Sequence, residues 1–234
     1  MLHAKLVREG FKVNVKVVER IYREERLWLR RTKRKKIPKE GREGGWCPIA
    51  ANQRWSLDFT SDALANGRKF RTANLKDDCT RECPAIEMDF SLPGERVVEM
   101  LQRVARERGY PDILVVDNGP ELRGRALDAW ADDHGVQLYF IDPGKPTQNA
   151  YIESFNGRFR DECLNQHWFT SITEAREIIE NWRIDYNTER PHSSLKYQTP
   201  EEFAAARPFN KTQWAQPLEL LDGSAPAPIA HAAE

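Results

Sequence analysis

The order in which strand-like and helix-like segments follow one another between residues 54 and 186 limits the fold of this chain more than any other feature. Three segments in succession alternate apolar and polar side chains, as strands do, and an Ala-Asn-Gly turn joins the first two. After these, segments with helical spacing alternate with segments that resemble strands. The segments are strands 54–64, 69–78 and 82–90, helix 95–108, strand 113–116, helix 126–134, strand 136–141, and helices 147–164 and 173–186. This order predicts an α/β fold, with a mixed five-stranded sheet flanked by helices.

The rest of the chain divides around this region. Residues 1–29 are typical of two short helices about a Gly turn, a partial helix-turn-helix-like segment in which Asn14 caps the second helix. We expect a basic linker over 30–46 and a single sheet-bearing domain over 47–205. Residues 206–234, which end in SAPAPIAHAAE, predict a flexible tail.

The charge of the chain is uneven, although 36 Lys and Arg balance 36 Asp and Glu. Residues 1–45 carry 15 basic and 6 acidic side chains, and the remaining residues carry 21 and 30. A basic arm on an acidic body is typical of a segment that binds a polyanion, and a solvated linker is the alternative. The candidate phosphate contacts in the linker are Arg30, Arg31, Lys33, Arg34, Lys35 and Lys36.

Composition excludes several classes of protein. Since no run approaches about 18 consecutive apolar residues, the sequence predicts no membrane span, and the first residues lack the apolar core of a secretory signal. The 4 cysteines and 5 histidines show no spacing typical of structural zinc. We therefore expect a cytoplasmic protein with reduced thiols.

Three carboxylates stand at positions typical of a catalytic or metal-binding site. Asp58 lies inside the first strand, in WSLDFT; Asp117 follows the apolar strand ILVV; Glu153 lies in the first turns of a helix. An ionised carboxylate within a strand is costly without a partner, and loops at strand ends are where ligands collect. Together the three would make an oxygen-rich site suited to Mg²⁺ or Mn²⁺. Singly, each also fits a plain structural role, as a satisfied polar strand residue, a turn residue or a solvent-facing helix residue.

The motifs around these carboxylates resemble one family closely. Between Asp117 and Glu153 lie 35 residues, as in the D,D-35-E signature of retroviral integrases and related transposases. The words VDNGPE (116–121), PGKPTQNAYIESFNGRFRDECLN (143–165) and WRIDYNTERPHSSLKYQTPEEF (182–203) resemble the OrfB transposase of the insertion-sequence-three family of bacterial mobile elements. The likeness covers roughly residues 1–205, although the chain opens inside the N-terminal helix-turn-helix region of that family.

The resemblance implies a retroviral-integrase-like, RNase H-like catalytic core over 47–205 that cleaves and joins DNA strands with two divalent ions, Mg²⁺ or Mn²⁺. Carried over by position, Asp58, Asp117 and Glu153 are the catalytic metal ligands. Arg160 matches the basic residue two helical turns after the glutamate, and seven residues return to nearly the same helix face. Ile152, Phe155 and Phe159 would then face the core.

Further residues take expected roles beside this core. The expected DNA contacts around the active helix are Lys145, Asn149, Asn156, Arg158 and Arg160. We expect Asp78 and Arg81 to shape the exit of the second strand. His192 fits packing or capping at least as well as DNA contact. Core packing is the expectation for Trp130, Trp168 and Trp182.

The resemblance also implies partners. They are the DNA of the element's terminal repeats and of the target, an OrfA subunit or an OrfA–OrfB fusion, and at least a second copy of the chain, in a nucleoid-associated bacterial setting. Two alternatives stay open: a catalytically silent DNA-binding remnant or regulator of transposition, and a ribonuclease H-like nuclease acting on hybrids.

Overall fold

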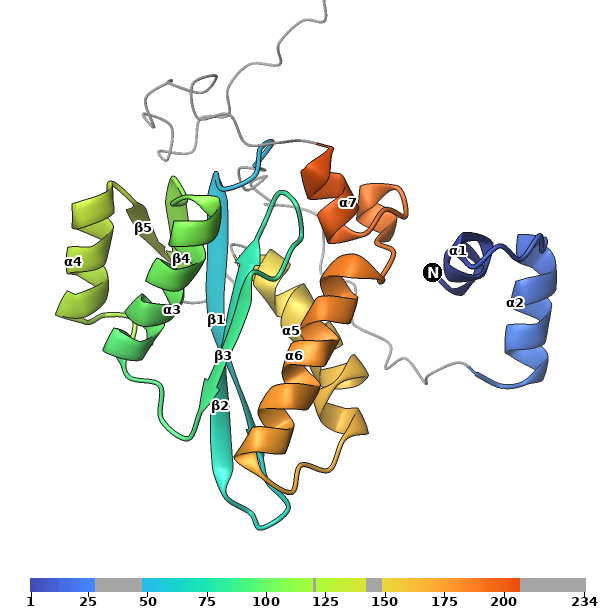
Figure 1. The fold of residues 1–234 in the computed structure, drawn as a ribbon, viewed down its shortest axis with the longest axis horizontal. Helices are drawn as coiled ribbons and strands as arrows, with labels where there is room; N and C mark the ends of the chain where they lie inside the picture. The colour runs from blue at the N-terminus through green and yellow to red at the C-terminus, as the bar shows by residue number, and fades with distance from the viewer. Residues whose placement is uncertain (28–47, 120, 142–148, 207–234) are drawn as a thin grey trace, which may run out of the picture.

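The computed structural model describes residues 1–27, 48–119, 121–141 and 149–206, and Figure 1 shows their fold. One five-stranded sheet runs through the centre, with strand order β3-β2-β1-β4-β5. The strands are β1 (Arg54–Ala63), β2 (Lys69–Asp77), β3 (Ala85–Asp89), β4 (Ile113–Val116) and β5 (Gln137–Phe140). The pairs β1–β2 and β2–β3 are antiparallel, whereas β1–β4 and β4–β5 are parallel. The predicted mixed sheet is confirmed.

Helices cover both faces of the sheet (Figure 1). On one side lie α3 (Gly94–Arg108) and α4 (Arg125–His134), and on the other lie α5 (Ala150–Glu162) and α6 (Ile172–Thr188). The short elements η2 (Leu164–Gln166), η3 (Ser193–Leu195) and α7 (Pro200–Ala205) follow α5 and α6. Of the predicted helix 147–164, residues 147 and 148 lie outside the described residues.

Because strand side chains alternate between faces, the sheet separates two cores. Leu57 and Leu75 face α3 and α4, where they pack with Leu101 and Trp130. The opposite core, under α5 and α6, is rich in aromatic side chains. Its largest buried members are Phe70, Phe155, Phe159, Phe169 and Tyr186. The aromatic core packs α5 against the sheet. It thereby sets the position of α5 relative to β1, and with it the position of the site described below.

The N-terminal segment forms the expected pair of helices, α1 (Leu2–Arg8) and α2 (Val15–Glu24). Asn14 caps α2 as predicted, since its side chain accepts a 2.9 Å hydrogen bond from the backbone N–H of Lys16. None of the residues in these two helices is buried. Arg8 donates a hydrogen bond to Glu202 of α7, with a 2.6 Å ion pair.

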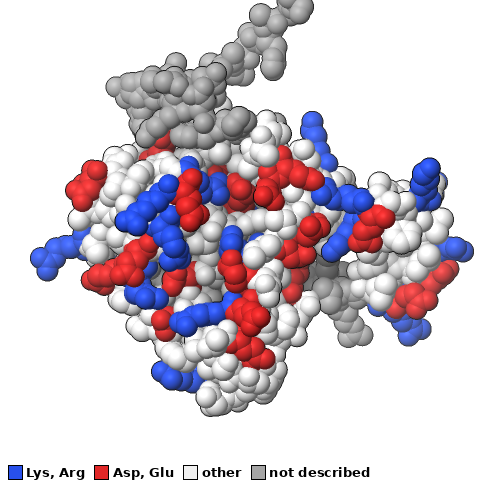
Figure 2. All heavy atoms as spheres, in the orientation of Figure 1, with Lys and Arg blue, Asp and Glu red and all other residues white. Residues whose placement is uncertain are grey.

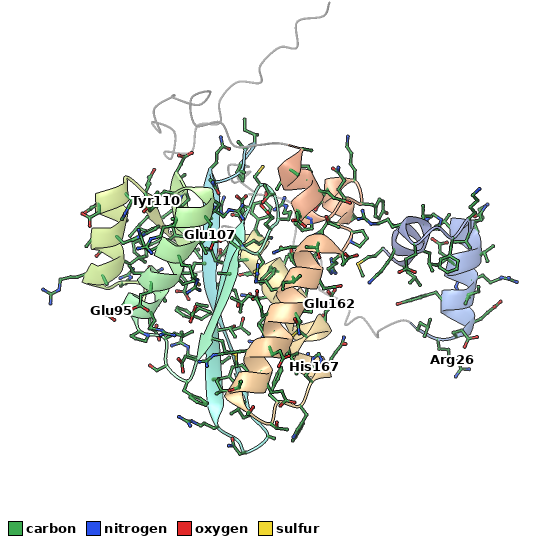
Figure 3. The ribbon with its side chains drawn as sticks, in the orientation of Figure 1. Arg26, Glu95, Glu107, Tyr110, Glu162 and His167 are labelled. Carbon is green, nitrogen blue, oxygen red and sulfur yellow. The ribbon has the colours of Figure 1, made fainter. Side chains whose placement is uncertain are left out.

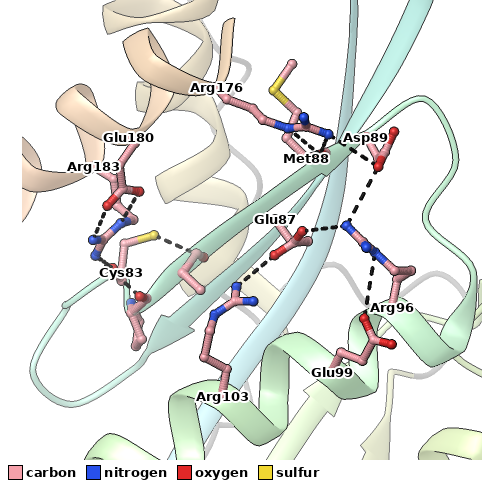
Figure 4. A network of polar contacts seen from close by, with 12 residues as sticks. Cys83, Glu87, Met88, Asp89, Arg96, Glu99, Arg103, Arg176, Glu180 and Arg183 are labelled. Atoms are coloured by element: carbon pink, nitrogen blue, oxygen red, sulfur yellow. Dashed lines mark hydrogen bonds and ion pairs between the residues drawn. The ribbon is translucent and has the colours of Figure 1, made fainter. Parts of the chain in front are cut away.

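The outer strand β3 is held by charged side chains from both layers (Figure 4). Glu87 accepts from Arg96 at 3.1 Å and from Arg103 at 2.7 Å, both on α3. Asp89 contacts Arg96 at 3.7 Å and Arg176 of α6 at 3.3 Å. Charged side chains of this kind protect an edge strand from pairing with another chain.

The tryptophan predictions have a mixed outcome. Trp130 is 4% exposed, and Trp182 packs against the aromatic core, as predicted. Core packing is wrong for Trp168, which is 79% exposed. It lies in the irregular segment between η2 and α6 rather than in a helix, so no helix face turns it inward.

Cys79, Cys83 and Cys163 are free and buried. Burial raises the thiol pKa of Cys83 and of Cys163 to about 12, which keeps both thiols protonated and unreactive. Within the described ranges, no helix is both long and apolar enough to cross a membrane.

Candidate active site

Strand register brings two of the three predicted carboxylates to neighbouring positions. In the parallel pair β1–β4, Leu57 stands opposite Val116. Asp58 and Asp117 each come directly after that pair, one inside β1 and one at the carboxyl end of β4. The apolar run ILVV is typical of a short buried strand, and the structure pairs it with the strand that contains WSLDFT.

The carboxylate of Asp58 is fixed by two donors. Its Oδ1 accepts a 2.8 Å hydrogen bond from the backbone N–H of Phe59, and its Oδ2 accepts a 2.7 Å hydrogen bond from Nδ2 of Asn156 on α5. The pKa of Asp58 is raised to about 6, chiefly by burial and in addition by the charges of Asp117 and Glu153, against the lowering effect of the two hydrogen bonds. The three predicted carboxylates therefore act on one another electrostatically.

The loop that bears Asp117 is tied down by its own polar groups. Oδ1 of Asp117 accepts a 2.9 Å hydrogen bond from the backbone N–H of Gly119. The next residue, Asn118, donates to the carbonyl oxygen of Ile141 at 2.6 Å and accepts from Arg123 at 2.5 Å. The loop is thus attached to the end of β5 as well as to β4.

A charged pair crosses from the sheet to the same loop. Arg71 of β2 forms an ion pair with Glu121, and its guanidinium lies over the ring of Phe59 at 4.4 Å. This pairing lowers the pKa of the Glu121 carboxyl. The loop after Asp117 is therefore held to β2 through Arg71, which also contacts β1 next to Asp58.

Helix α5 supplies the third carboxylate. Ile152, Phe155 and Phe159 are fully buried in the aromatic core, as their helical spacing predicts, while Glu153 and Arg160 are exposed. Glu153 lies in the first turn. Since Asn156 comes three residues after Glu153 and reaches Asp58, the helix meets the middle of β1 through this polar side chain.

Both ends of α5 are fixed to other elements. At its C-terminal end Glu162 accepts a 2.7 Å hydrogen bond from Arg190, which follows α6 (Figure 3). At its N-terminal end Lys76 of β2 donates to the backbone carbonyl of Tyr151 at 2.9 Å. Burial lowers the pKa of Lys76 to about 7, although the nearby Asp78 carboxylate opposes this.

Three cations surround the side chain of Tyr151. Arg81 lies 4.1 Å from the ring centroid, Lys76 lies 5.6 Å from it and Arg54 lies 5.7 Å from it. Asp78 pairs with Arg54 at 2.9 Å, and Arg81 adopts a left-handed backbone conformation with φ of 67°. This arrangement agrees with the structural role expected for Asp78 and Arg81 at the exit of β2.

The predicted DNA contacts fall into three groups. Arg160 is exposed on the same side as Glu153, where a phosphate can reach it. Arg158 is half-buried and close enough to His192 to lower the pKa of that imidazole. Lys145 and the six basic residues of the 30–46 linker lie in parts of the chain that the structure does not describe.

Two of the predicted contacts do not fit the structure. Asn149 is 4% exposed and Asn156 is 8% exposed. The amide of Asn156 is used on both sides, since it donates to Asp58 and accepts from Asn74. These asparagines are buried, and the signal that could have shown this is their spacing, because Asn149 and Asn156 lie three and four residues from the buried Ile152, on the same side of the helix.

His192 takes the packing role. It is 4% exposed and stands edge-on to the ring of Tyr186, with 4.9 Å between the ring centroids. Burial lowers its pKa to about 3, with the charges of Arg190, Arg158 and Lys76 acting in the same direction. A neutral imidazole in this place belongs to the aromatic core.

The carboxylates of Asp58, Asp117 and Glu153 do not form a preassembled metal site. Across the described residues, no group of three His, Cys, Asp or Glu side chains lies close enough together to hold a metal ion as it stands. The donor chemistry nevertheless suits a hard divalent cation, because carboxylate oxygens are the ligands that Mg²⁺ and Mn²⁺ prefer.

Comparison with protein families gives two matches, both described as integrase core domain, over residues 49–146 and 134–200. Among curated proteins, the chain is 51% identical over 204 residues to the 31.7 kDa protein of insertion element IS407 from Burkholderia multivorans, which covers 87% of this chain and 74% of that protein. It is 47% identical over 204 residues to the 39.2 kDa protein of insertion element IS476 from Xanthomonas euvesicatoria, of which it spans 59%.

Solved structures support the same fold. A chain of the simian T-cell lymphotropic virus intasome, in complex with a PP2A regulatory subunit, matches with a TM-score of 0.62 at 14% identity, over 86% of this chain and 65% of that chain. The HTLV-2 integrase catalytic core domain, solved in complex with magnesium, matches with a TM-score of 0.52 at 12% identity, over 67% of this chain and 98% of that one. The predicted RNase H-like fold is thus confirmed.

The fold and the relatives agree with the sequence motifs around Asp117 and Glu153. The chain belongs to the insertion-sequence transposases that contain an integrase core domain.

Proposed function

We propose that Asp58, Asp117 and Glu153 are the metal ligands of a polynucleotidyl transferase that cleaves and rejoins DNA strands during movement of a bacterial insertion sequence. The observation that carries this proposal is the strand register that brings Asp58 and Asp117 to neighbouring positions, with Glu153 in the first turn of the helix whose Asn156 binds Asp58. Burial raises the pKa of Asp58 and the charges of Asp117 and Glu153 add to this effect, so a cation bound here would relieve an unfavourable charge.

Two ions of Mg²⁺ or Mn²⁺ are the cofactors that this donor set fits. When bound, they would activate the attacking oxygen and stabilise charge on the leaving oxygen of the phosphodiester. A water molecule is the nucleophile for the nick, and the freed 3′-OH attacks the target strand. The site then needs no Ser, Cys or His nucleophile of its own.

The chain contributes position and charge to this reaction. Phe59 and Asn156 orient the carboxylate of Asp58, and the N–H of Gly119 orients that of Asp117. The buried side of α5 packs against the sheet, and Glu153 stands on the exposed side of the same helix. Groups held in place before the substrate arrives need little reorganisation during the reaction.

DNA binding calls for cations close to the site. On the face shown in Figure 2, basic and acidic side chains are interspersed rather than gathered in a single basic surface. Arg160, exposed two turns after Glu153, is the described cation placed to meet a phosphate next to the scissile bond. Lys145 and the 30–46 linker would add contacts that are not specific to sequence.

The partners follow from the family. Transposases and integrases of this kind act on DNA and form oligomers. We propose terminal-repeat and target DNA as substrates, a second copy of the chain as partner, an OrfA subunit for recognition of the ends, and a cytoplasmic, nucleoid-associated location.

The test uses the purified chain, labelled duplexes taken from the two ends of the encoding element, and MnCl₂ or MgCl₂. We expect nicking and strand joining by the wild type, and loss of both by Asp117→Asn and by Glu153→Gln. Thr72→Val, a change within β2 that touches none of the three carboxylates, is the matched control. DNA binding without cleavage in the presence of OrfA would instead indicate a silent regulator, and cleavage of RNA–DNA hybrids alone would indicate a ribonuclease.

A further inference from the structure

Asn74 lies in the middle of β2, directly opposite Asp58 of β1. Its side chain is completely buried. Nδ2 of Asn74 donates to Oδ1 of Asn156 at 2.7 Å and to Oγ1 of Thr60 at 3.1 Å. Nδ2 of Asn156 in turn donates to Oδ2 of Asp58 at 2.7 Å. A chain of hydrogen bonds therefore runs from the sheet, through α5, to the carboxylate.

The chemistry of the three side chains allows only one assignment of donors and acceptors in this series of hydrogen bonds. An ionised carboxylate only accepts hydrogen bonds, so Asn156 must turn its NH₂ group toward Asp58. Its carbonyl oxygen then faces Asn74, which must donate. Without that donor the amide of Asn156 is free to rotate by half a turn, which would set its oxygen against the carboxylate of Asp58.

The hydrogen bonds of Asn74 satisfy only one end of its amide. Among the described residues, Oδ1 of Asn74 has no hydrogen-bond partner, although it is buried. A buried polar atom without a partner destabilises a fold, and leucine, with the same branching, would fill the place with apolar atoms. Polar groups retained against this cost in a core are expected where they serve a functional site.

We propose that Asn74 is a positioning residue for DNA strand cleavage: by fixing the amide of Asn156, it holds Oδ2 of Asp58 in the orientation that receives a divalent cation. This inference rests on the proposed function of Asp58 as a metal ligand. Asn74 itself is completely buried and its amide contacts Asn156 rather than Asp58, so we assign it no direct contact with a cation or with DNA.

The experiment measures nicking of supercoiled plasmid DNA against MnCl₂ concentration for the wild type, Asn74→Leu, Asn156→Ala and the double variant. Outer groups that orient a metal ligand typically change metal affinity by about 10-fold or more. We expect Asn74→Leu to raise the half-saturating Mn²⁺ concentration by roughly 10-fold, with a Tm lower by only a few degrees because Oδ1 of Asn156 and Oγ1 of Thr60 lose this donor. Thr72→Val, on the same face of β2, is the control and should match the wild type.

The double variant decides whether Asn74 acts through Asn156. If it does, the double variant resembles Asn156→Ala alone, since the second change has nothing left to remove. Effects that multiply would overturn the proposal, as would an Asn74→Leu variant with wild-type Mn²⁺ dependence. Should Asn74→Leu fail to fold, Asn74→Ala takes its place in the cycle.

A second readout does not depend on activity. In ¹⁵N-labelled wild-type protein the side-chain NH₂ of Asn156 should be protected from exchange with water, and Asn74→Leu should remove that protection. Unchanged protection would overturn the proposal. A wild type that fails to nick under any condition, while the amide signals behave as expected, would remove the proposed function of Asp58 and leave the orientation of Asn156 established.

Discussion

The ammonium of Lys76, buried within β2, donates a hydrogen bond to the backbone carbonyl of Tyr151 in the first turn of α5, 2.9 Å away. Tyr151 precedes Glu153 by two residues. The sheet therefore holds the start of the helix from which the third carboxylate projects, and it does so through a side chain whose burial lowers its pKa to about 7.

Replacing this lysine should separate stability from activity. We expect Lys76→Met to fold with an equal or higher Tm, because burial disfavours the charged ammonium, and to nick DNA roughly 10-fold more slowly, because small displacements of a catalytic group are costly. Lys69→Met, at the exposed start of the same strand, is the control. Equal activity in the two variants would show that the anchor is dispensable.

Asp58→Asn should stabilise the metal-free protein while abolishing its activity. The folded-state pKa of Asp58 is raised to about 6, above its usual value near 4, so its ionisation opposes folding at pH 7. Asparagine removes that charge and its oxygen can accept from Asn156, at the loss of the bond from the backbone of Phe59. A gain of about 1–3 kcal/mol is expected, which corresponds to a Tm higher by several degrees in EDTA. Thermal unfolding at pH 7 checks the sign, and a lower Tm would contradict it.

Gly119→Ala should disturb the site without unfolding the chain. A Cβ at Gly119 would lie 2.9 Å from Oδ1 of Asp117, so the carboxylate must move. We expect at least a 10-fold loss of metal-dependent nicking. At Gly157 of α5 a Cβ meets nothing within 4 Å, so Gly157→Ala is a matched control that should keep activity and raise stability by about 0.5–1 kcal/mol. Parallel Tm and nicking measurements distinguish the two.

The buried imidazole of His192 should make stability depend on pH. Its folded-state pKa, about 3, lies below its usual value near 6.5, so its contribution is complete above pH 6.5. Below that pH the unfolded chain takes up the proton first, and stability falls as the pH drops toward 3. His192→Phe keeps the ring against Tyr186 and should lose Tm less steeply between pH 7 and pH 5. His134→Gln, at the end of α4, is the comparison, and parallel slopes for all three proteins would refute the assignment.

Periodicity in the sequence predicts the sheet well because burial imposes it. The run ILVV and the alternation around Asp58 each admit one arrangement in which the apolar side chains are covered. Trp168 shows where this reasoning fails. Its neighbours permit a helix, but the chain between η2 and α6 is irregular, and an irregular segment imposes no face on its side chains.

The carboxylates at the candidate site could be found from spacing, but the groups that orient them could not. Asp58 and Asn74 stand equally far from Asn66 in the turn between β1 and β2, so the hairpin register alone would have paired them. What spacing cannot show is that α5 packs with Asn156 between the two, since that contact depends on how the aromatic core seats the helix.

Along β3 each charge has more than one partner. Glu87 receives Arg96 and Arg103, and Arg96 also reaches Asp89. Since single exposed ion pairs contribute little, neutralising any one of these side chains leaves the outer strand shielded by the others. The edge of the sheet thereby tolerates point substitution, whereas Oδ2 of Asp58 has one hydrogen-bond donor, the amide of Asn156, within the part of the chain that the structure describes.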